Sequence, residues 1–271
     1  MELLERVHRA VDRIALAPGV RSWGRKRYEA RFAANKDENL FRGVFPTFSA
    51  AAASAPALKP LGYDNEDSAD IPYSSALTPW DYAPMFWLAR SFAEGMRSVF
   101  DLGGHVGVKY YAYRRTLRYP EDLRWTVCDV PAVVRRGQEL ARARAPEGCL
   151  HFTDRYEDAS GYHVLFASGS LQYLPLTLAE LLRDLPAKPR RIIVNTTPIH
   201  SSRSFYTLNS IGTAFCAYRV QARDEFVKSV LDLGYERADE WDNLGKGLHL
   251  PYEDGYDVPH YTGFCFNRKA S

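Results

Sequence analysis

The 271-residue sequence has no apolar stretch approaching the roughly 20 residues that a membrane-spanning helix needs. Its first residues, MELLERVHRAVDRIALAPG, are charged every few positions and predict neither a signal peptide nor a membrane span. The formal net charge is only +2 and no basic block dominates, which argues against nucleic acid as the main partner. The four cysteines are far apart and form no CxxC pair, which argues against a zinc cluster or a disulfide scaffold. These absences predict a soluble, cytoplasmic protein.

The N-terminal third shows little regular periodicity. Residues 2–16 place Leu3, Leu4, Val7, Val11 and Ile14 on one side of a helix that APG ends. Residues 17–75 are rich in Pro, Ala, Ser and aromatics, and they predict an irregular segment with short helices. A helical pattern resumes over 78–96. We assign residues 1–96 to an extension that either covers the substrate pocket as a lid or simply packs on the main domain.

From residue 97 the pattern changes to short apolar strands that alternate with amphipathic helices. The predicted strands are 98–102, 124–130, 150–154, 162–168 and 190–196. Strand–helix alternation with continuous apolar strands predicts a parallel, doubly wound α/β sheet. A helix at 223–235 and strands at 236–243 and 260–268 follow, and one member of that closing pair must run antiparallel. Residues 97–271 therefore resemble the seven-stranded, Rossmann-like sheet of class I methyltransferases.

The first predicted strand runs into the loop FDLGGHVG, residues 100–107. Glycine has no Cβ, so Gly103 and Gly104 would let a ligand lie against the main chain beyond the strand end. The alternative is a turn that needs glycine only for its geometry. The spacing does not match the G-x-G-x-x-G of dinucleotide-binding loops, and no G-K-[ST] follows as in a P-loop. The order fits better the D-x-G-G-x-x-G form found where S-adenosylmethionine binds.

An acid follows at the end of the second predicted strand. Asp129 comes 22 residues after Gly107 (129 − 107), where a carboxylate would accept both hydroxyls of a ribose. Because Pro131 stands at a plausible first helical turn, Asp129 would otherwise act as a helix cap. The upstream loop favours ribose binding.

DLGGHVG and CDVPAVV resemble the loop and second-strand acid of small-molecule O-methyltransferases. The chain is also similar to a family of bacterial methyltransferases, mostly uncharacterised and often encoded among surface-polysaccharide genes. The stretches that carry this resemblance lie between residues 28 and 241: YEARF, LFRGVFPTFSAA, FDLGGHVGVKYY, WTVCDVP, FASGSLQYL, TP and LGYERADEW. The resemblance implies S-adenosyl-L-methionine as cofactor and names no acceptor.

Carried over by position, the resemblance implies a set of cofactor-binding residues. Those beside the methionine and ribose are Asp101, Gly103, Gly104, Gly107 and Asp129; Val130 would flank the adenine, Thr153 and Asp154 would lie near its amine, and Ser168, Gly169, Ser170 and Leu171 would form the floor under the sulfonium. His105 occupies a third-glycine position, and its side chain is expected to point past the amino-acid end of the cofactor.

The resemblance does not supply a general base, because the histidine that serves as base in small-molecule O-methyltransferases has no counterpart in this sequence. Aligning SLQYL with the L-H-D segment of O-methyltransferases puts Gln172 where their histidine stands, and an amide cannot take a proton. His200, after the fifth strand, is our candidate base, with His249 and His260 as further options. Gln172, Tyr173, Arg203 and Tyr206 are candidate substrate contacts, Arg203 because its planar fork suits a carboxylate or phosphate.

The aromatics of the extension fit either a lid or ordinary packing, including packing in a homodimer; they are Tyr28, Phe32, Trp80, Tyr82, Phe86 and Trp87. The leading hypothesis is a methyltransferase that acts on a small-molecule or glycan-type acceptor, with oxygen as the expected site of methylation and no metal ion. A methyltransferase-like binding or assembly protein without turnover is the alternative from another class. An NAD-dependent oxidoreductase is disfavoured by the glycine spacing.

Overall fold

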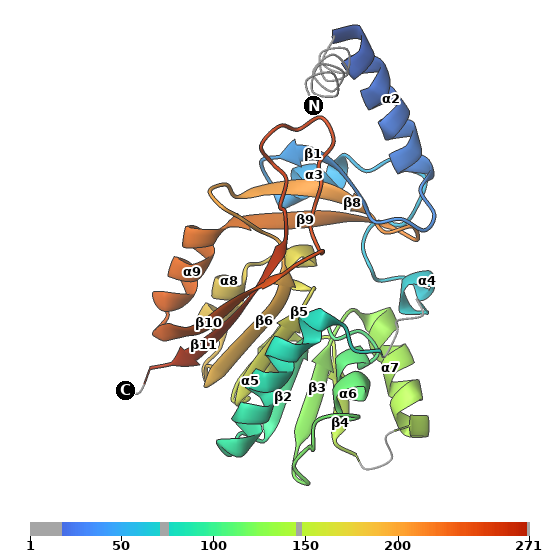
Figure 1. The fold of residues 1–271 in the computed structure, drawn as a ribbon. Helices are drawn as coiled ribbons and strands as arrows, with labels where there is room; N and C mark the ends of the chain where they lie inside the picture. The colour runs from blue at the N-terminus through green and yellow to red at the C-terminus, as the bar shows by residue number, and fades with distance from the viewer. Residues whose placement is uncertain (1–17, 71–75, 145–147, 270–271) are drawn as a thin grey trace, which may run out of the picture.

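The computed structural model describes residues 18–70, 76–144 and 148–269. The helix predicted over 2–16 lies outside these ranges. The described residues form two β-sheets, one of seven strands and one of four. The larger sheet forms the body of the molecule, and the smaller one lies beyond the ends of its strands (Figure 1).

The seven-stranded sheet confirms the predicted fold class. Its strand order is β10-β11-β6-β5-β2-β3-β4. The five parallel strands are β2 (Ser98–Leu102), β3 (Arg124–Cys128), β4 (Leu150–Thr153), β5 (Val164–Ser168) and β6 (Arg191–Thr197). The closing strands are β10 (Tyr235–Asn243) and β11 (Tyr261–Arg268), and β11 runs antiparallel to both β6 and β10. This order, with one antiparallel strand, is that of the class I methyltransferase sheet.

Helices cover both faces of this sheet because alternate residues of each strand point to opposite sides. One face packs on α5 (Tyr82–Ala93), α6 (Val108–Tyr113) and α7 (Pro131–Arg144), with Val99, Trp125 and Phe166 among the buried strand residues. The other face packs on α8 (Leu178–Asp184) and α9 (Arg223–Leu231), with Phe100 and Leu165 buried there. The strands are apolar on both sides, which explains why the sequence shows continuous apolar runs in this region.

The smaller sheet is a feature that the sequence did not predict. Its order is β1-β8-β9-β7, from β1 (Leu40–Phe45), β7 (Ile199–His200), β8 (Phe205–Ser210) and β9 (Phe215–Ala222). β1 pairs antiparallel with β8, so part of the N-terminal segment joins a hairpin inserted after β6. The short helix α3 (Phe48–Ala53) packs on β8 and β9. This sheet, together with α3, lies over the carboxyl ends of the parallel strands (Figure 1).

The N-terminal segment is more regular than predicted. A helix of 17 residues, α2 (Pro18–Ala34), is the first element of the described chain. A short α4 (Glu66–Ala69) follows later. Among the predicted aromatics, Phe32 and Trp87 are buried in packing clusters, whereas Tyr82 and Phe86 are exposed. No helix within the described ranges combines the length and apolar character needed to cross a bilayer.

Candidate active site

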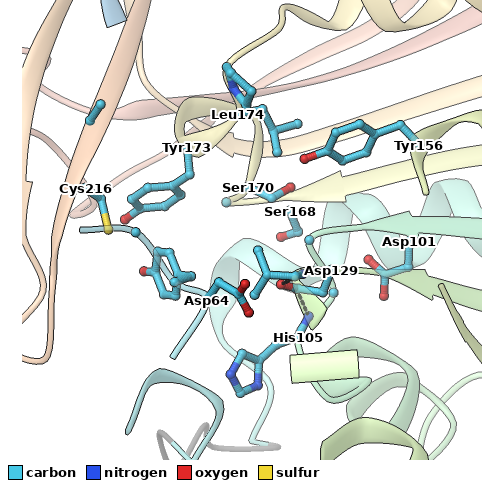
Figure 2. Close-up of a pocket in the computed structure, with 18 of the residues that line it drawn as sticks. Asp64, Asp101, His105, Asp129, Tyr156, Ser168, Ser170, Tyr173, Leu174 and Cys216 are labelled. Atoms are coloured by element: carbon cyan, nitrogen blue, oxygen red, sulfur yellow. Dashed lines mark hydrogen bonds between the residues drawn. The ribbon is translucent and has the colours of Figure 1, made fainter. Parts of the chain in front are cut away.

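A cavity of about 410 Å³ opens where the two sheets meet, beyond the carboxyl ends of β2, β3 and β5. This volume falls within the range of about 300–1,000 Å³ that is common for small-molecule sites. One half is lined by the predicted glycine loop and its neighbours: Asp101, Gly103, Gly104, His105, Val108, Lys109, Asp129, Val130, Tyr156, Ser168, Gly169 and Ser170. The other half is lined by Phe48, Ala52, Leu61, Gly62, Tyr63, Tyr173, Leu174, Pro175, Cys216 and Ala217, with Asp64 at the boundary (Figure 2).

The glycine loop needs both of its central glycines for steric reasons. Gly103 has φ +71°, and a Cβ there would lie 2.2 Å from the Cβ of Ser170. A Cβ on Gly104 would lie 2.4 Å from a carboxylate oxygen of Asp101. Main chain therefore lines the cavity at this point, which leaves a cradle that any side chain would fill. Gly107 also has a positive φ and precedes α6, but it does not line the cavity.

His105 takes the left-handed conformation that a glycine usually supplies, with φ 54°. Its main-chain N–H donates to Asp129 Oδ2 at 2.8 Å, the bond drawn in Figure 2. Its side chain reaches the N-terminal segment, where Nε2 lies 3.0 Å from the carbonyl of Ser68. Because a carbonyl only accepts, Nε2 carries the hydrogen. His105 thus fastens the glycine loop to α4.

The carboxylate of Asp129 is fixed at the end of β3. Oδ2 accepts from His105 N, and Oδ1 accepts from Val130 N at 2.8 Å. Burial raises the pKa of Asp129, while these two main-chain donors oppose the rise. The next helical donor, Ala132 N, is taken by Asp64 Oδ1 at 3.0 Å. The capping of α7 is therefore shared, and Asp129 keeps lone pairs that face the cavity.

Asp101 is the most deeply buried acid of the site, with 1% of its surface exposed. Trp125 Nε1 donates to its Oδ2 at 3.1 Å. Burial raises the pKa of Asp101 to about 7; the charge of Asp129 adds to the rise, and the hydrogen bond from Trp125 opposes it. A cationic group bound next to this carboxyl would favour its ionised form.

Ser168, Gly169 and Ser170, which were predicted to lie under the sulfonium, line the cavity at the end of β5. Ser170 Oγ donates to the carbonyl of Leu102, which ties the β5 end to the glycine loop. Leu171 and Gln172 are buried but do not line the cavity.

At the end of β4 the structure brings a different residue to the cavity. Neither Thr153 nor Asp154 lines it, and Thr153 Oγ1 instead donates to Asp158 at 2.6 Å. Tyr156, from the short 3-10 turn Tyr156–Ala159, lines the cavity in their place. The sequence offered no specific signal for Tyr156, because a single tyrosine after a strand is common.

His200 lies in β7 rather than at the cavity. Its Nδ1 accepts from Ser202 N and Arg203 N, and its Nε2 lies 3.1 Å from the carbonyl of Gly255. Both ring nitrogens are thus used to hold a loop, and the structure lends no support to His200 as the base. Arg203 is exposed, stacks on Tyr256 at 4.8 Å, and also donates to Gly255 O.

The other candidate histidines and Tyr206 are not among the cavity residues either. His249 lies 2.8 Å from Asp257, and His260 lies 3.4 Å from Asp242. Tyr206, on β8, contacts the cavity residue Phe48 edge to face, with ring centroids 6.2 Å apart.

Tyr173 is the one predicted substrate contact that lines the cavity. Its hydroxyl donates to Asn209 Oδ1 at 3.1 Å, and its ring meets those of Tyr63 and Tyr218 edge to face at 5.0 and 4.9 Å. Burial raises its pKa well above the usual value. Burial likewise raises the pKa of the neighbouring Cys216 thiol to about 12. Both groups therefore keep their protons at neutral pH.

No protein-family model matches the chain, and no curated protein matches its sequence. Solved structures with a similar chain path include the CcbJ methyltransferase from Streptomyces caelestis, with 14% identity, a TM-score of 0.46, and coverage of 77% of this chain and 98% of that one. Magnesium protoporphyrin IX methyltransferase from Synechocystis PCC 6803 has 14% identity and a TM-score of 0.44, with coverage of 69% and 79%. At these values the similarity carries no information on ligand or reaction.

Proposed function

We propose that the protein is an S-adenosylmethionine-dependent methyltransferase that acts on a hydroxyl group of a small molecule. The observation that carries this proposal is the single cavity that joins the glycine loop and Asp129 to a separate apolar half. A methyl transfer needs both parts, because the donor and the acceptor must meet in line within one enclosed site. In this proposal residues 97–271 hold the cofactor, and the described part of residues 1–96 supplies one wall.

The residues of the glycine-loop half fit an adenosyl cofactor. The main chain at Gly103 and Gly104 leaves room for the amino-acid part, and Asp101 provides a buried acceptor for a cationic group. Asp129 would accept from the ribose, and Tyr156 offers an aromatic face for the adenine. When bound, the cofactor supplies an electrophilic methyl group, so the chain has only to align the acceptor and exclude water.

The other half of the cavity indicates the kind of acceptor. Its lining residues are all uncharged, and most are apolar or aromatic. A phosphate or carboxylate placed there would lose its hydration without gaining a cationic partner, which is costly. The lining therefore favours an uncharged, flat or apolar small molecule over a phosphorylated sugar or nucleotide sugar. A neutral glycan-type acceptor stays the alternative within this proposal.

The protonated state of Tyr173 and Cys216 supports a second candidate function. Neither group can take a proton from the acceptor at neutral pH, which fits a binding protein that keeps the fold without turnover. A phenol could instead enter the apolar half uncharged and lose its proton to water beside the cationic sulfonium of the bound cofactor, so it would not need a base on the protein.

A calorimetric titration tests the cofactor assignment directly. S-adenosylmethionine and S-adenosylhomocysteine should bind with one site per chain, and NAD should not bind. Binding of NAD alone would refute the proposal. An assay for S-adenosylhomocysteine formation, with uncharged phenols in one panel and nucleotide sugars in another, then separates turnover from binding. Product with the phenol panel supports the enzyme, and binding without product in either panel supports the second candidate.

A further inference from the structure

Asp64 is a cavity residue that belongs to the N-terminal segment, outside the seven-stranded sheet. The residues just before it are anchored on the smaller sheet: Leu61 forms a β-bridge with Phe215, and Gly62 N donates to the carbonyl of Phe215 at 2.8 Å. Asp64 Oδ1 then accepts from Ala132 N in the first turn of α7. Asp64 therefore links the smaller sheet to the glycine-loop half of the cavity.

Two carboxylates accept from main-chain N–H groups at the start of α7. Asp129 binds Val130 N, and Asp64 binds Ala132 N, two residues further along the chain. Since Val130 directly precedes α7 and Ala132 lies in its first turn, the two acids are neighbours, and both line the cavity (Figure 2). The helix dipole stabilises negative charge at this end.

The free lone pairs of the two acids differ in number. Both oxygens of Asp129 already accept a main-chain N–H. Within the ranges that the structure describes, no group donates to Asp64 Oδ2, and the Asp64 side chain is exposed at the cavity. A carboxylate oxygen placed like this is ready to accept from a ligand.

A pair of adjacent carboxylates fits one kind of neutral ligand group particularly well. Two hydroxyls on neighbouring carbons donate two hydrogen bonds in slightly different directions, so each acid can accept one of them. The nearby cation Lys109 is already paired with Asp81 at 2.5 Å and is thus not free to neutralise the two acids. The hydrogen-bond donors that reach Asp64 and Asp129 from the cavity would therefore belong to the ligand.

We propose that Asp64 is a second acceptor for the ribose hydroxyls of the adenosyl cofactor, next to Asp129. The N-terminal segment would then be part of the cofactor site and not only a wall beside the acceptor. This inference rests on the proposed function, since it takes the adenosyl group as the ligand.

The capping role of Asp64 can be separated from ligand binding by choice of substitution. Asparagine caps helices about as well as aspartate, so Asp64→Asn should keep the bond to Ala132 N and leave the midpoint of thermal unfolding nearly unchanged. It removes the charged acceptor, so the Kd for S-adenosylhomocysteine should rise about tenfold. Asp64→Ala should raise the Kd as well and also lower the unfolding midpoint. Asp67→Asn is the matched control, because Asp67 is exposed in α4 and does not line the cavity.

A ligand without ribose hydroxyls makes the test specific. The Kd of S-(2′,3′-dideoxyadenosyl)-L-homocysteine should be the same for the natural protein and Asp64→Asn. Equal loss of affinity for both ligands would refute the ribose role. An unchanged Kd of Asp64→Asn for S-adenosylhomocysteine would leave Asp64 as a helix cap only and overturn the inference, while the proposed function would stand. Failure of the natural protein to bind S-adenosylhomocysteine would overturn both.

Discussion

Replacing Asp101 by asparagine should change how the stability of the protein depends on pH. Asp101 is almost fully buried, and burial raises its pKa from 3.8 to about 7. Between these two values the folded protein keeps a proton that the unfolded chain has released. The free energy of unfolding therefore falls as the pH rises through this range, and the full loss is reached above pH 7.

The size of the effect follows from the shift. Each pKa unit corresponds to about 1.4 kcal/mol, so the buried carboxyl costs the folded state roughly 4 kcal/mol at pH 8. Asparagine has no such titration and can still accept from Trp125 Nε1 through its amide oxygen. The stability of Asp101→Asn relative to the natural protein should thus rise by about 3 kcal/mol between pH 5 and pH 8.

Urea unfolding of both proteins at several pH values measures this difference, because the other titrating groups are common to the two and cancel. A difference in unfolding free energy that is the same at pH 5 and pH 8 would show that Asp101 does not titrate in this range. The rise of the Asp101 pKa through burial would then be wrong.

Three further predictions concern the predicted site residues. Asp129→Ala should weaken S-adenosylhomocysteine binding at least about tenfold in calorimetry, about 1.4 kcal/mol, whereas Asp154→Ala, outside the cavity, should leave the Kd unchanged; similar Kd values for the two variants would refute the ribose assignment of Asp129. Gly103→Ala should lower the unfolding free energy by about 1–3 kcal/mol, since the new methyl group would collide with Ser170. An unchanged unfolding free energy in urea would show that the glycine loop shifts to accommodate the methyl group at little cost. His200→Ala should lower the thermal midpoint and leave the Kd for S-adenosylhomocysteine unchanged; a changed Kd with normal stability would point back to a role at the site.

Much of the larger sheet was predictable because its strands are buried on both faces. Runs such as RIIVNT have an apolar centre, and the helices between the strands are amphipathic. Asp101 near the end of β2 and Asp129 just after β3 line the same cavity, because the carboxyl ends of parallel strands meet at one side of the sheet.

The smaller sheet was not predictable in the same way. β8 is buried along nearly its whole length, yet it carries Thr207, Asn209 and Ser210, so it shows neither a two-residue alternation nor an apolar run. In β9 the buried Arg219 interrupts the apolar run. β1 is short and contains Gly43 with a positive φ, next to a shift in the pairing register. β1 becomes a strand because it pairs with β8, a segment more than 150 residues further along the sequence.

Apart from Tyr173, the residues of the apolar half of the cavity were not predicted, for this reason. Phe48, Tyr63 and Cys216 reach the cavity through the pairing of the N-terminal segment with the hairpin after β6. Sequence position alone gives no sign of that pairing. The same holds for Asp64, which lies in a polar, turn-like stretch where an aspartate is ordinary.

The most direct test of the account is a crystal structure of the complex with S-adenosylhomocysteine. We expect the amino-acid part to lie against Gly103 and Gly104, the ribose hydroxyls to contact Asp129, and the sulfur to face the apolar half that contains Tyr173. A ligand bound away from the glycine loop, or with its ribose out of reach of Asp129, would contradict the central claim.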